Sequence, residues 1–159
     1  MRVLIAYASK TGNTEECANK IKGFMKTETV DLINLKKQSR VDLNQYDKVV
    51  IGTPLYMGQP ARQFKSFLDK NASELMSKEM YLYVCGLARG QEGIDLLQKQ
   101  VSPKLFDHAS FVGQLGGDVH LQKLNPIYKW MMKKILAESK PNLGLMLEEI
   151  EKFASEIES

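Results

Sequence analysis

The 159-residue sequence predicts an α/β fold in which a five-stranded parallel sheet carries helices on both faces. Two observations support this: five short apolar runs are spaced along the chain, and the segments between them place apolar residues at helical spacing. The apolar runs alternate little with polar residues, which is typical of strands covered on both faces. With 43% hydrophobic and 26% charged residues and no repeat or linker, the composition indicates one domain over residues 1–159.

The five apolar runs are expected to be the strands of the sheet. They cover residues 3–7, 29–33, 48–52, 81–86 and 110–115. Because a connection separates each run from the next, right-handed crossovers should make neighbouring strands parallel.

Four segments are expected to be helices that pack on this sheet. Their inward-facing residues are Cys17, Ile21, Phe24 and Met25 in the first, Phe64, Phe67 and Leu68 in the second, Ile94 and Leu97 in the third, and Met146, Ile150, Phe153 and Ile157 in the last. Pro60 is expected as the first residue of the second helix, since proline suits that position. Pro103 should stop the third helix, and Asn142 should cap the last one.

Composition and charge exclude several classes of protein. No apolar run reaches the roughly 18–20 residues that a membrane span needs, and the apolar segment after Arg2 is too short for a secretory signal. Cys17 and Cys85 lie far apart without a CxxC pattern, so no disulfide framework and a cytoplasmic location are expected. The net charge of +3 does not indicate nucleic acid binding.

The loops at the carboxyl ends of the first, third and fourth strands are the candidate ligand site, because open parallel sheets bind ligands there. The first loop consists of Ser9, Lys10, Thr11, Gly12, Asn13 and Thr14. Its hydroxyls and its glycine, at the start of a helix, are typical of a site for a phosphate group. No GxxxxGK[ST] pattern is present, so the loop does not indicate hydrolysis of nucleoside triphosphates. The alternative is an ordinary turn with Thr14 as the helix cap.

The pattern S-x-T-G-N-T after an N-terminal strand resembles the phosphate loop of flavodoxins, which hold flavin mononucleotide (FMN). The resemblance implies a three-layer flavodoxin-like fold with strand order 2-1-3-4-5 and FMN at the point where the order reverses. It also implies which groups hold the phosphate. These are Ser9, Thr11, Asn13 and Thr14 together with the backbone of Lys10 and Gly12.

The second loop consists of Thr53, Pro54, Leu55, Tyr56, Met57 and Gly58. An aromatic ring and a thioether can cover a flat apolar ring system. The resemblance implies that this loop flanks the isoalloxazine ring, with Tyr56 stacked on it and the Met57–Gly58 peptide turned toward flavin N5. The alternative is that Tyr56 and Met57 pack beneath the following helix.

The third loop consists of Gly86, Leu87, Ala88 and Arg89. The resemblance implies that its backbone N–H groups border the pyrimidine end of the flavin. It lacks the second aromatic residue that flavodoxins often place there. Arg89 either stabilises an anionic reduced flavin or points into water. Cys85 and Cys17 are interpreted as buried core residues, and His108 and His120 lack partners at metal-ligand spacing, so no metal site is expected.

Residues 116–139 exceed what a minimal five-stranded fold of this type requires and form a basic, aromatic insertion. Between His120 and Lys140 there are five lysines and one glutamate, a net charge of +4 that leaves −1 for the rest of the chain. The segment also contains Trp130, the only tryptophan. It either packs over the sheet edge as a solvated helix or meets a membrane surface or a hydrophobic partner.

The insertion and the third loop also resemble those of menaquinone-dependent protoporphyrinogen dehydrogenases. The matching residues are Leu87-Ala88-Arg89 and Tyr128-Lys129-Trp130-Met131. This resemblance implies that FMN passes electrons from an organic substrate to a quinone-like acceptor, without a catalytic side chain. It allows peripheral contact with the inner face of a membrane through residues 120–140. The alternatives are a flavodoxin-type electron shuttle between protein partners and a flavin-free interaction domain.

Overall fold

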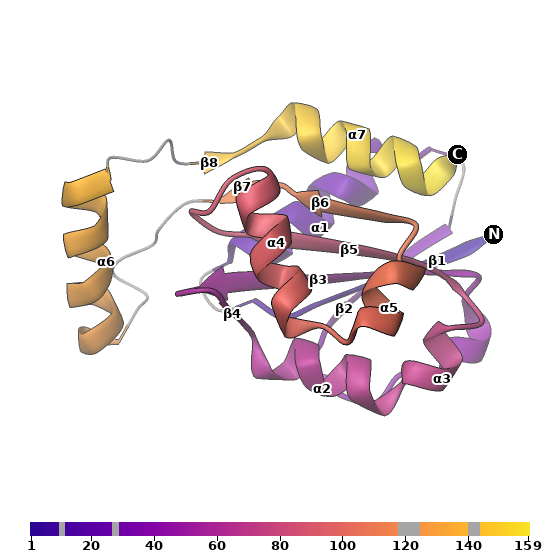
Figure 1. Cartoon of the computed structure of the whole chain (residues 1–159). Coiled ribbons are helices and arrows are strands. Elements are labelled where there is room, and N and C mark those ends of the chain that lie inside the picture. Colours follow the sequence, from indigo (N-terminus) through magenta and orange to yellow (C-terminus); the bar gives the residue numbers. More distant parts are fainter. Residues whose placement is uncertain (10–11, 27–28, 118–124, 140–143) are drawn as a thin grey trace.

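The central sheet has five parallel strands in the order β2-β1-β3-β5-β6, as shown in the computed structural model of the chain (Figure 1). The structure describes residues 1–9, 12–26, 29–117, 125–139 and 144–159. The strands, in chain order, are β1 (Arg2–Tyr7), β2 (Thr29–Asn34), β3 (Lys48–Tyr56), β5 (Glu79–Cys85) and β6 (Phe111–Gln114). Counted along the chain, this confirms the predicted order 2-1-3-4-5.

Helices cover both faces of the sheet, which makes the fold three-layered (Figure 1). One face carries α1 (Asn13–Phe24) and α7 (Leu147–Glu158), and the other carries α2 (Arg62–Lys70), α3 (Ala72–Leu75), α4 (Gln91–Gln100) and α5 (Pro103–His108). A short 3-10 helix, η1 (Leu43–Gln45), lies between β2 and β3. The predicted α/β class and the helices on both faces are confirmed.

Alternate residues of the strands point to opposite faces of the sheet and are buried in two separate apolar cores, one on each face. Val3 and Ile5 of β1 face α1 and α7, whereas Leu4 and Ala6 face the layer with α2 and α4. All four side chains are fully buried. This explains why the strand runs are apolar at every position rather than at every second one.

Phe153 of α7 is the centre of the core beneath that helix. Its ring makes edge-to-face contacts with Tyr81, Tyr83 and Phe111, at centroid distances of 6.4, 5.8 and 5.8 Å. Ile150 and Ile157 are buried beside it. The predicted inner face of the last helix is therefore confirmed for these three residues of α7, while Asn142, the predicted cap, lies outside the described residues and Met146 occupies the cap position.

Pro60 is not the first residue of a helix, so that prediction is wrong. β3 continues four residues past Gly52 and folds back as β4 (Gln59–Pro60), which pairs with it antiparallel. Proline suits this edge position because the β4 strand needs few ladder N–H groups. Pro103 lies beyond the end of α4, as expected, and opens α5, with the Ser102 hydroxyl accepting a hydrogen bond from Leu105 N at 3.4 Å.

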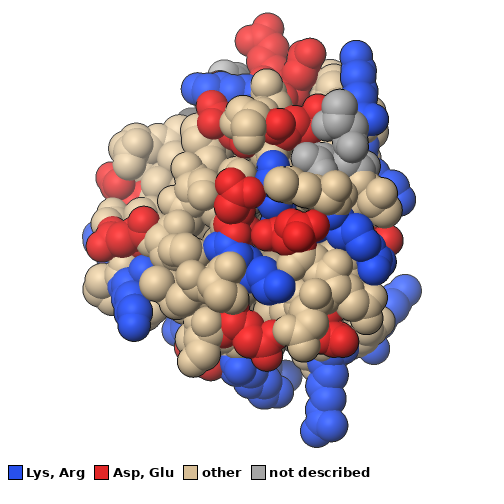
Figure 2. Space-filling view, turned by 90° about the vertical axis from the view of Figure 1, so that its right-hand side faces the viewer, with Lys and Arg blue, Asp and Glu red and all other residues tan. Residues whose placement is uncertain are grey.

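The insertion leaves and rejoins the fold through a two-stranded ribbon. β7 (Gly116–Gly117) pairs antiparallel with β8 (Gly144–Leu145), and α6 (Pro126–Ser139) lies between them in the chain. Figure 1 shows α6 beyond the carboxyl ends of the strands, set apart from the sheet. On the opposite side, where the chain termini lie, lysine and arginine are interspersed with acidic residues (Figure 2).

Candidate functional site

The first loop is held at the carboxyl end of β1 by the neighbouring strand. Ala8 N donates to the Gly52 carbonyl at 3.1 Å, and Gly12 N donates to the Ser9 hydroxyl at 3.1 Å. Gly12 has φ 103°, a left-handed conformation that favours glycine and that turns the chain into α1. Lys10 and Thr11, two of the predicted phosphate ligands, lie outside the described residues.

Thr14 lies in the first turn of α1 and is almost fully buried. Its Oγ1 atom is buried without a nitrogen or oxygen hydrogen-bond partner among the described residues, and the weakly hydrogen-bonding Cys85 thiol lies beside it. Gly12, and not Thr14, is the N-cap of α1, and a glycine has no side chain with which to cap the helix. A buried hydroxyl without a strong hydrogen bond costs free energy, so the start of α1 is suited to a ligand that supplies acceptor oxygens. The group that fits is a phosphate.

Tyr83 of β5 fixes the position of α1, and sequence reasoning missed it. Its hydroxyl donates to the Thr14 carbonyl at 2.9 Å, and its ring lies across Gly52. A Cβ atom on Gly52 would lie 2.0 Å from Cζ of this ring, so only glycine leaves room for it. The signal in the sequence was a glycine at the end of an apolar strand, which often marks a close approach by another group.

Tyr7 and Glu15 also join β1 to the first turn of α1. The Tyr7 hydroxyl donates to Glu15 Oε1 at 3.3 Å. Burial and the nearby Glu15 carboxylate raise the pKa of the Tyr7 phenol, so it remains a neutral donor. The acidic side chain is thereby held against the strand.

The second loop is a tight hairpin that joins β3 to β4. Met57 and Gly58 form its tip with φ values of 54° and 78°, as a two-residue turn with both central residues left-handed requires. Positive φ is unfavourable for methionine, and the Met57 side chain is 53% exposed. The Met57–Gly58 peptide, which is predicted to face flavin N5, therefore lies at a strained and exposed position. As part of the turn, its carbonyl and N–H take no part in the hydrogen bonds between β3 and β4.

Thr53 stabilises this hairpin through hydrogen bonds of its side chain to the backbone. Its Oγ1 accepts a hydrogen bond from Ala61 N at 2.9 Å and donates to the Pro54 carbonyl at 2.9 Å. Leu55 is buried in the core with α2 and α4, whereas Tyr56 is half-buried. The structure thus places Thr53 and Leu55 in the scaffold of the hairpin, whereas Tyr56 is half-buried and Met57 is exposed.

The third loop is bound to the β7 ribbon. Gly86 N donates to the Gly116 carbonyl at 3.0 Å, and Gln114 Nε2 donates to the Gly86 carbonyl at 3.1 Å. An Arg89 nitrogen lies 3.3 Å from the Gly117 carbonyl oxygen, so its guanidinium group contacts β7. Leu87 and Ala88 are half-buried beside these residues.

The second and third loops contact each other directly. A Cβ atom on Gly86 would lie 3.0 Å from the Leu55 carbonyl oxygen. Pro54 and Cys85 are paired across β3 and β5, and Tyr7 and Gly52 across β1 and β3. The ends of the three strands therefore bring the three predicted loops to one edge of the sheet.

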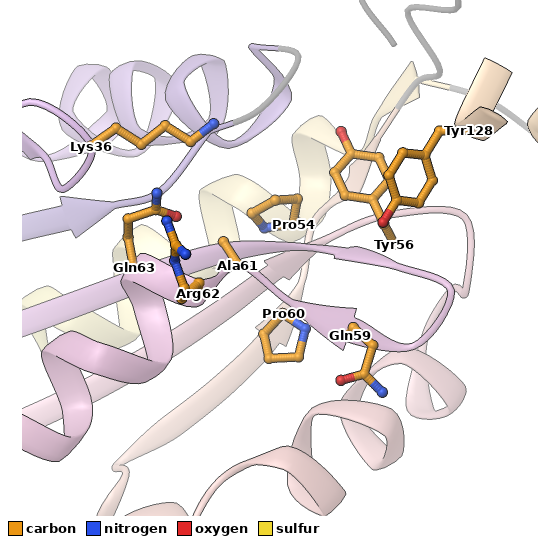
Figure 3. A pocket seen from close by; sticks show the side chains of 9 residues that line it. All are labelled: Lys36, Pro54, Tyr56, Gln59, Pro60, Ala61, Arg62, Gln63 and Tyr128. Carbon is orange, nitrogen blue, oxygen red and sulfur yellow. The ribbon is translucent and has the colours of Figure 1, made fainter. Parts of the chain in front are cut away.

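A cavity of about 390 Å³ adjoins the second loop (Figure 3). Figure 3 shows the Tyr56 and Tyr128 rings at one end of it and Lys36, Arg62 and Gln63 at the other. Its volume lies in the range of small-molecule sites. Sequence reasoning missed Lys36, Arg62 and Gln63, because residues after β2 and at the start of α2 carry no motif.

Among the described residues, no cluster of histidine, cysteine and carboxylate side chains could hold a metal ion. None of the helices in the described part of the chain is long and apolar enough to cross a membrane.

The family described as "Flavodoxin domain" matches residues 4–142. The chain belongs to this family. Flavodoxin of Haemophilus influenzae is 28% identical over 50% of this chain and 47% of its own length. Protoporphyrinogen IX dehydrogenase [quinone] of Escherichia coli K12 is also 28% identical, over 55% of this chain and 49% of its own length.

A solved flavodoxin shares the fold of this flavodoxin-domain chain. The structure of Fusobacterium nucleatum flavodoxin bound to FMN superposes with a TM-score of 0.54 at 14% identity, covering 99% of this chain and 96% of that one. The chain spans about half the length of the two sequence relatives.

Proposed function

We propose that this flavodoxin-domain chain binds FMN at the carboxyl edge of its sheet and acts as a redox flavoprotein. When bound, FMN accepts and donates the electrons of the reaction, so no acid, base or nucleophile is required of the chain. The buried Thr14 hydroxyl, which has no nitrogen or oxygen partner among the described residues, is the observation that carries this proposal. Membership of the flavodoxin domain family and an FMN-bound structural neighbour support it.

The chain contributes binding and orientation at each end of the cofactor. The Thr14 hydroxyl, the backbone at the start of α1 and Ser9, Lys10, Thr11, Gly12 and Asn13 would hold the phosphate. Tyr56 would cover the ring, and the Met57–Gly58 peptide would present a hydrogen-bonding group to its edge. The third loop, with Gly86, Leu87, Ala88 and Arg89, would border the pyrimidine end of the flavin ring. It would do so through backbone groups other than those that already hydrogen-bond to the β7 ribbon.

The Thr14→Ala variant tests the phosphate site by titration of the purified chain with FMN. Loss of one charge-assisted hydrogen bond should weaken binding roughly 5- to 150-fold. Thr14→Ser keeps the hydroxyl and should bind nearly as tightly as the parent chain. Thr29→Ala, at the exposed start of β2, is the matched control and should leave the affinity unchanged. Equal affinity of the Thr14→Ala and parent chains would contradict the placement of the phosphate.

Within this function, we propose electron transfer from an organic substrate to a quinone-like acceptor. The cavity beside Tyr56 supports it, because its two tyrosine rings and the cationic Lys36 and Arg62 suit a flat molecule with an anionic substituent. The similarity to protoporphyrinogen IX dehydrogenase supports the same reaction class. The alternative is an electron shuttle between proteins, which the equally high identity to a flavodoxin supports to the same degree.

Anaerobic reduction of the FMN-loaded chain distinguishes the two. Direct reduction by a porphyrinogen or a quinol, followed by the flavin spectrum, supports the enzyme. Reduction by a reductase protein alone supports the shuttle.

We also propose that α6 meets the acceptor or a membrane surface through residues 120–140. Ile127 and Trp130 are exposed on it, next to the basic Lys133 and Lys134. Deleting residues 122–137 should abolish quinone reduction or vesicle binding and leave FMN bound. A deletion variant that performs like the full chain in both assays would make the insertion a scaffold element.

A further inference from the structure

The two cysteines of the chain are neighbours in the fold, although 68 positions separate them. Cys17 Sγ and Cys85 Sγ lie 3.0 Å apart, and both are free thiols. Their side chains are 0% and 1% exposed. The sequence contains no other cysteine, so neither thiol has a competing partner within the chain.

The pair lies directly behind the proposed cofactor site. Cys17 is on α1, one turn after Thr14, and Cys85 is the last residue of β5, immediately before Gly86. A bond between the two would therefore join the helix that follows the first loop to the strand that leads into the third.

The surroundings of Cys85 favour its neutral thiol form. Burial raises the pKa of the Cys85 thiol well above its usual value, the contact with Cys17 raises it further, and the nearby Thr14 hydroxyl acts in the opposite direction. Because both side chains are buried, bulky and charged reagents cannot reach the two thiols. A small neutral oxidant is the class that can reach a buried pair.

We propose that Cys17 and Cys85 form a reversible disulfide when the chain meets hydrogen peroxide. One thiol attacks a peroxide oxygen as its thiolate, its proton passes to the departing oxygen, the O–O bond breaks, and a sulfenic acid and one water form. The second thiol then displaces the hydroxyl of the sulfenic acid as a second water, and the S–S bond forms. The two thiols lose two electrons in all, and the peroxide is reduced to two waters.

The geometry favours this second step over further oxidation. A disulfide has an S–S length of about 2.05 Å, so the sulfurs need to approach by only about 1 Å. When a sulfenic acid forms on one cysteine, the thiol of the other cysteine is already in contact with it and can react before a second peroxide arrives. The reaction needs no flavin, so it can succeed or fail independently of the proposed function.

Peptide mapping of the full chain tests the proposal. The chain is treated with hydrogen peroxide, the excess is removed with catalase, and free thiols are alkylated with N-ethylmaleimide in denaturant before tryptic digestion. We expect a peptide pair joined through Cys17 and Cys85, monomeric protein on a non-reducing gel, and full recovery of both alkylated cysteines after dithiothreitol. The melting temperature should rise by roughly 10 °C, because the bond closes a long loop in the unfolded chain.

Three results would overturn the proposal. They are two fully alkylated cysteines after peroxide, cysteines oxidised beyond recovery by dithiothreitol, and a disulfide between two chains. The Cys17→Ala variant is the control for the rise in melting temperature, which it should not show after the same treatment. If this variant fails to fold, the peptide map of the parent chain still decides.

Discussion

The helices α7 and α6 both carry large apolar residues, but they expose them very differently. Ile150, Phe153 and Ile157 of α7 are fully buried against the sheet. Ile127 and Trp130 of α6 are 72% and 66% exposed. Burial of large apolar side chains provides most of the stability of a domain, so α7 belongs to the scaffold, whereas these α6 residues contribute little to folding.

The exposed faces of the two helices also differ in charge. α7 carries five glutamates and a single lysine, whereas α6 carries three lysines and one glutamate. A basic helix with exposed apolar residues can bind a surface that is anionic and partly apolar. An acidic helix would be repelled by the negative charge of such a surface. The difference places a basic helix with exposed apolar residues at the same edge of the sheet as the three loops, and it is the basis of the proposed contact of α6 with an acceptor or a membrane.

Phe153→Ala on α7 should have the largest effect on folding. It removes a buried ring that contacts three other aromatic rings, so we expect a loss of about 3–5 kcal/mol in the free energy of unfolding. Urea unfolding followed by circular dichroism measures it. Phe153→Leu, which keeps most of the volume, is the matched control and should lose much less. A loss below about 1 kcal/mol for Phe153→Ala would contradict the role of α7 as scaffold.

Gly52→Ala should have the next largest effect, because its methyl group would collide with the buried Tyr83 ring. We expect a loss of about 1–3 kcal/mol, with weaker FMN binding as the ring shifts the first turn of α1. A double-mutant cycle with Tyr83→Ala identifies the cause. In the Tyr83→Ala background the penalty should largely disappear, and strictly additive losses would exclude the clash.

Met57→Gly should leave the chain as stable as the parent or up to about 1 kcal/mol more stable. Glycine in a strand or turn normally destabilises, but here it relieves a left-handed methionine at the hairpin tip. The matched control is Gln59→Gly in the adjoining β4 strand. This variant should have a lower free energy of unfolding than the parent chain. Loss of stability in Met57→Gly equal to that of the control would show that the tip is unstrained.

The strand pattern and the family motif were sufficient to predict the sheet order and the two helical layers from the sequence. The apolar runs allow only one arrangement of the layers. A strand with Leu4, Ile5 and Ala6 in succession needs an apolar core on each face of the sheet. The hairpin at Pro60 was not predictable in the same way. It depends on hydrogen bonds of Thr53 to residues up to eight positions away, and no local preference reveals them.

The candidate site was predicted loop by loop but not in its connections. The contacts of Tyr83 with Thr14, of Cys17 with Cys85 and of Gly86 with Gly116 join segments far apart in the chain. A single sequence carries no signal for such pairs, since each partner is an ordinary core or loop residue. Whether the individual residues bind FMN stays a prediction.

Trp130→Ala on α6 should have the smallest effect on folding, in contrast to Phe153→Ala. An exposed ring, with Lys134 Nζ 5.8 Å from its centroid, should contribute no more than about 0.5 kcal/mol to stability. The same substitution should weaken binding to vesicles that contain anionic lipid, measured by co-sedimentation, if α6 inserts its apolar residues into that surface. Phe111→Ala, half-buried on β6, is the control for loss of an aromatic ring without loss of vesicle binding. A Trp130→Ala chain that loses more than 1 kcal/mol of stability and keeps its vesicle binding would mean that the ring packs on the protein, and the contrast between α6 and α7 would then fail.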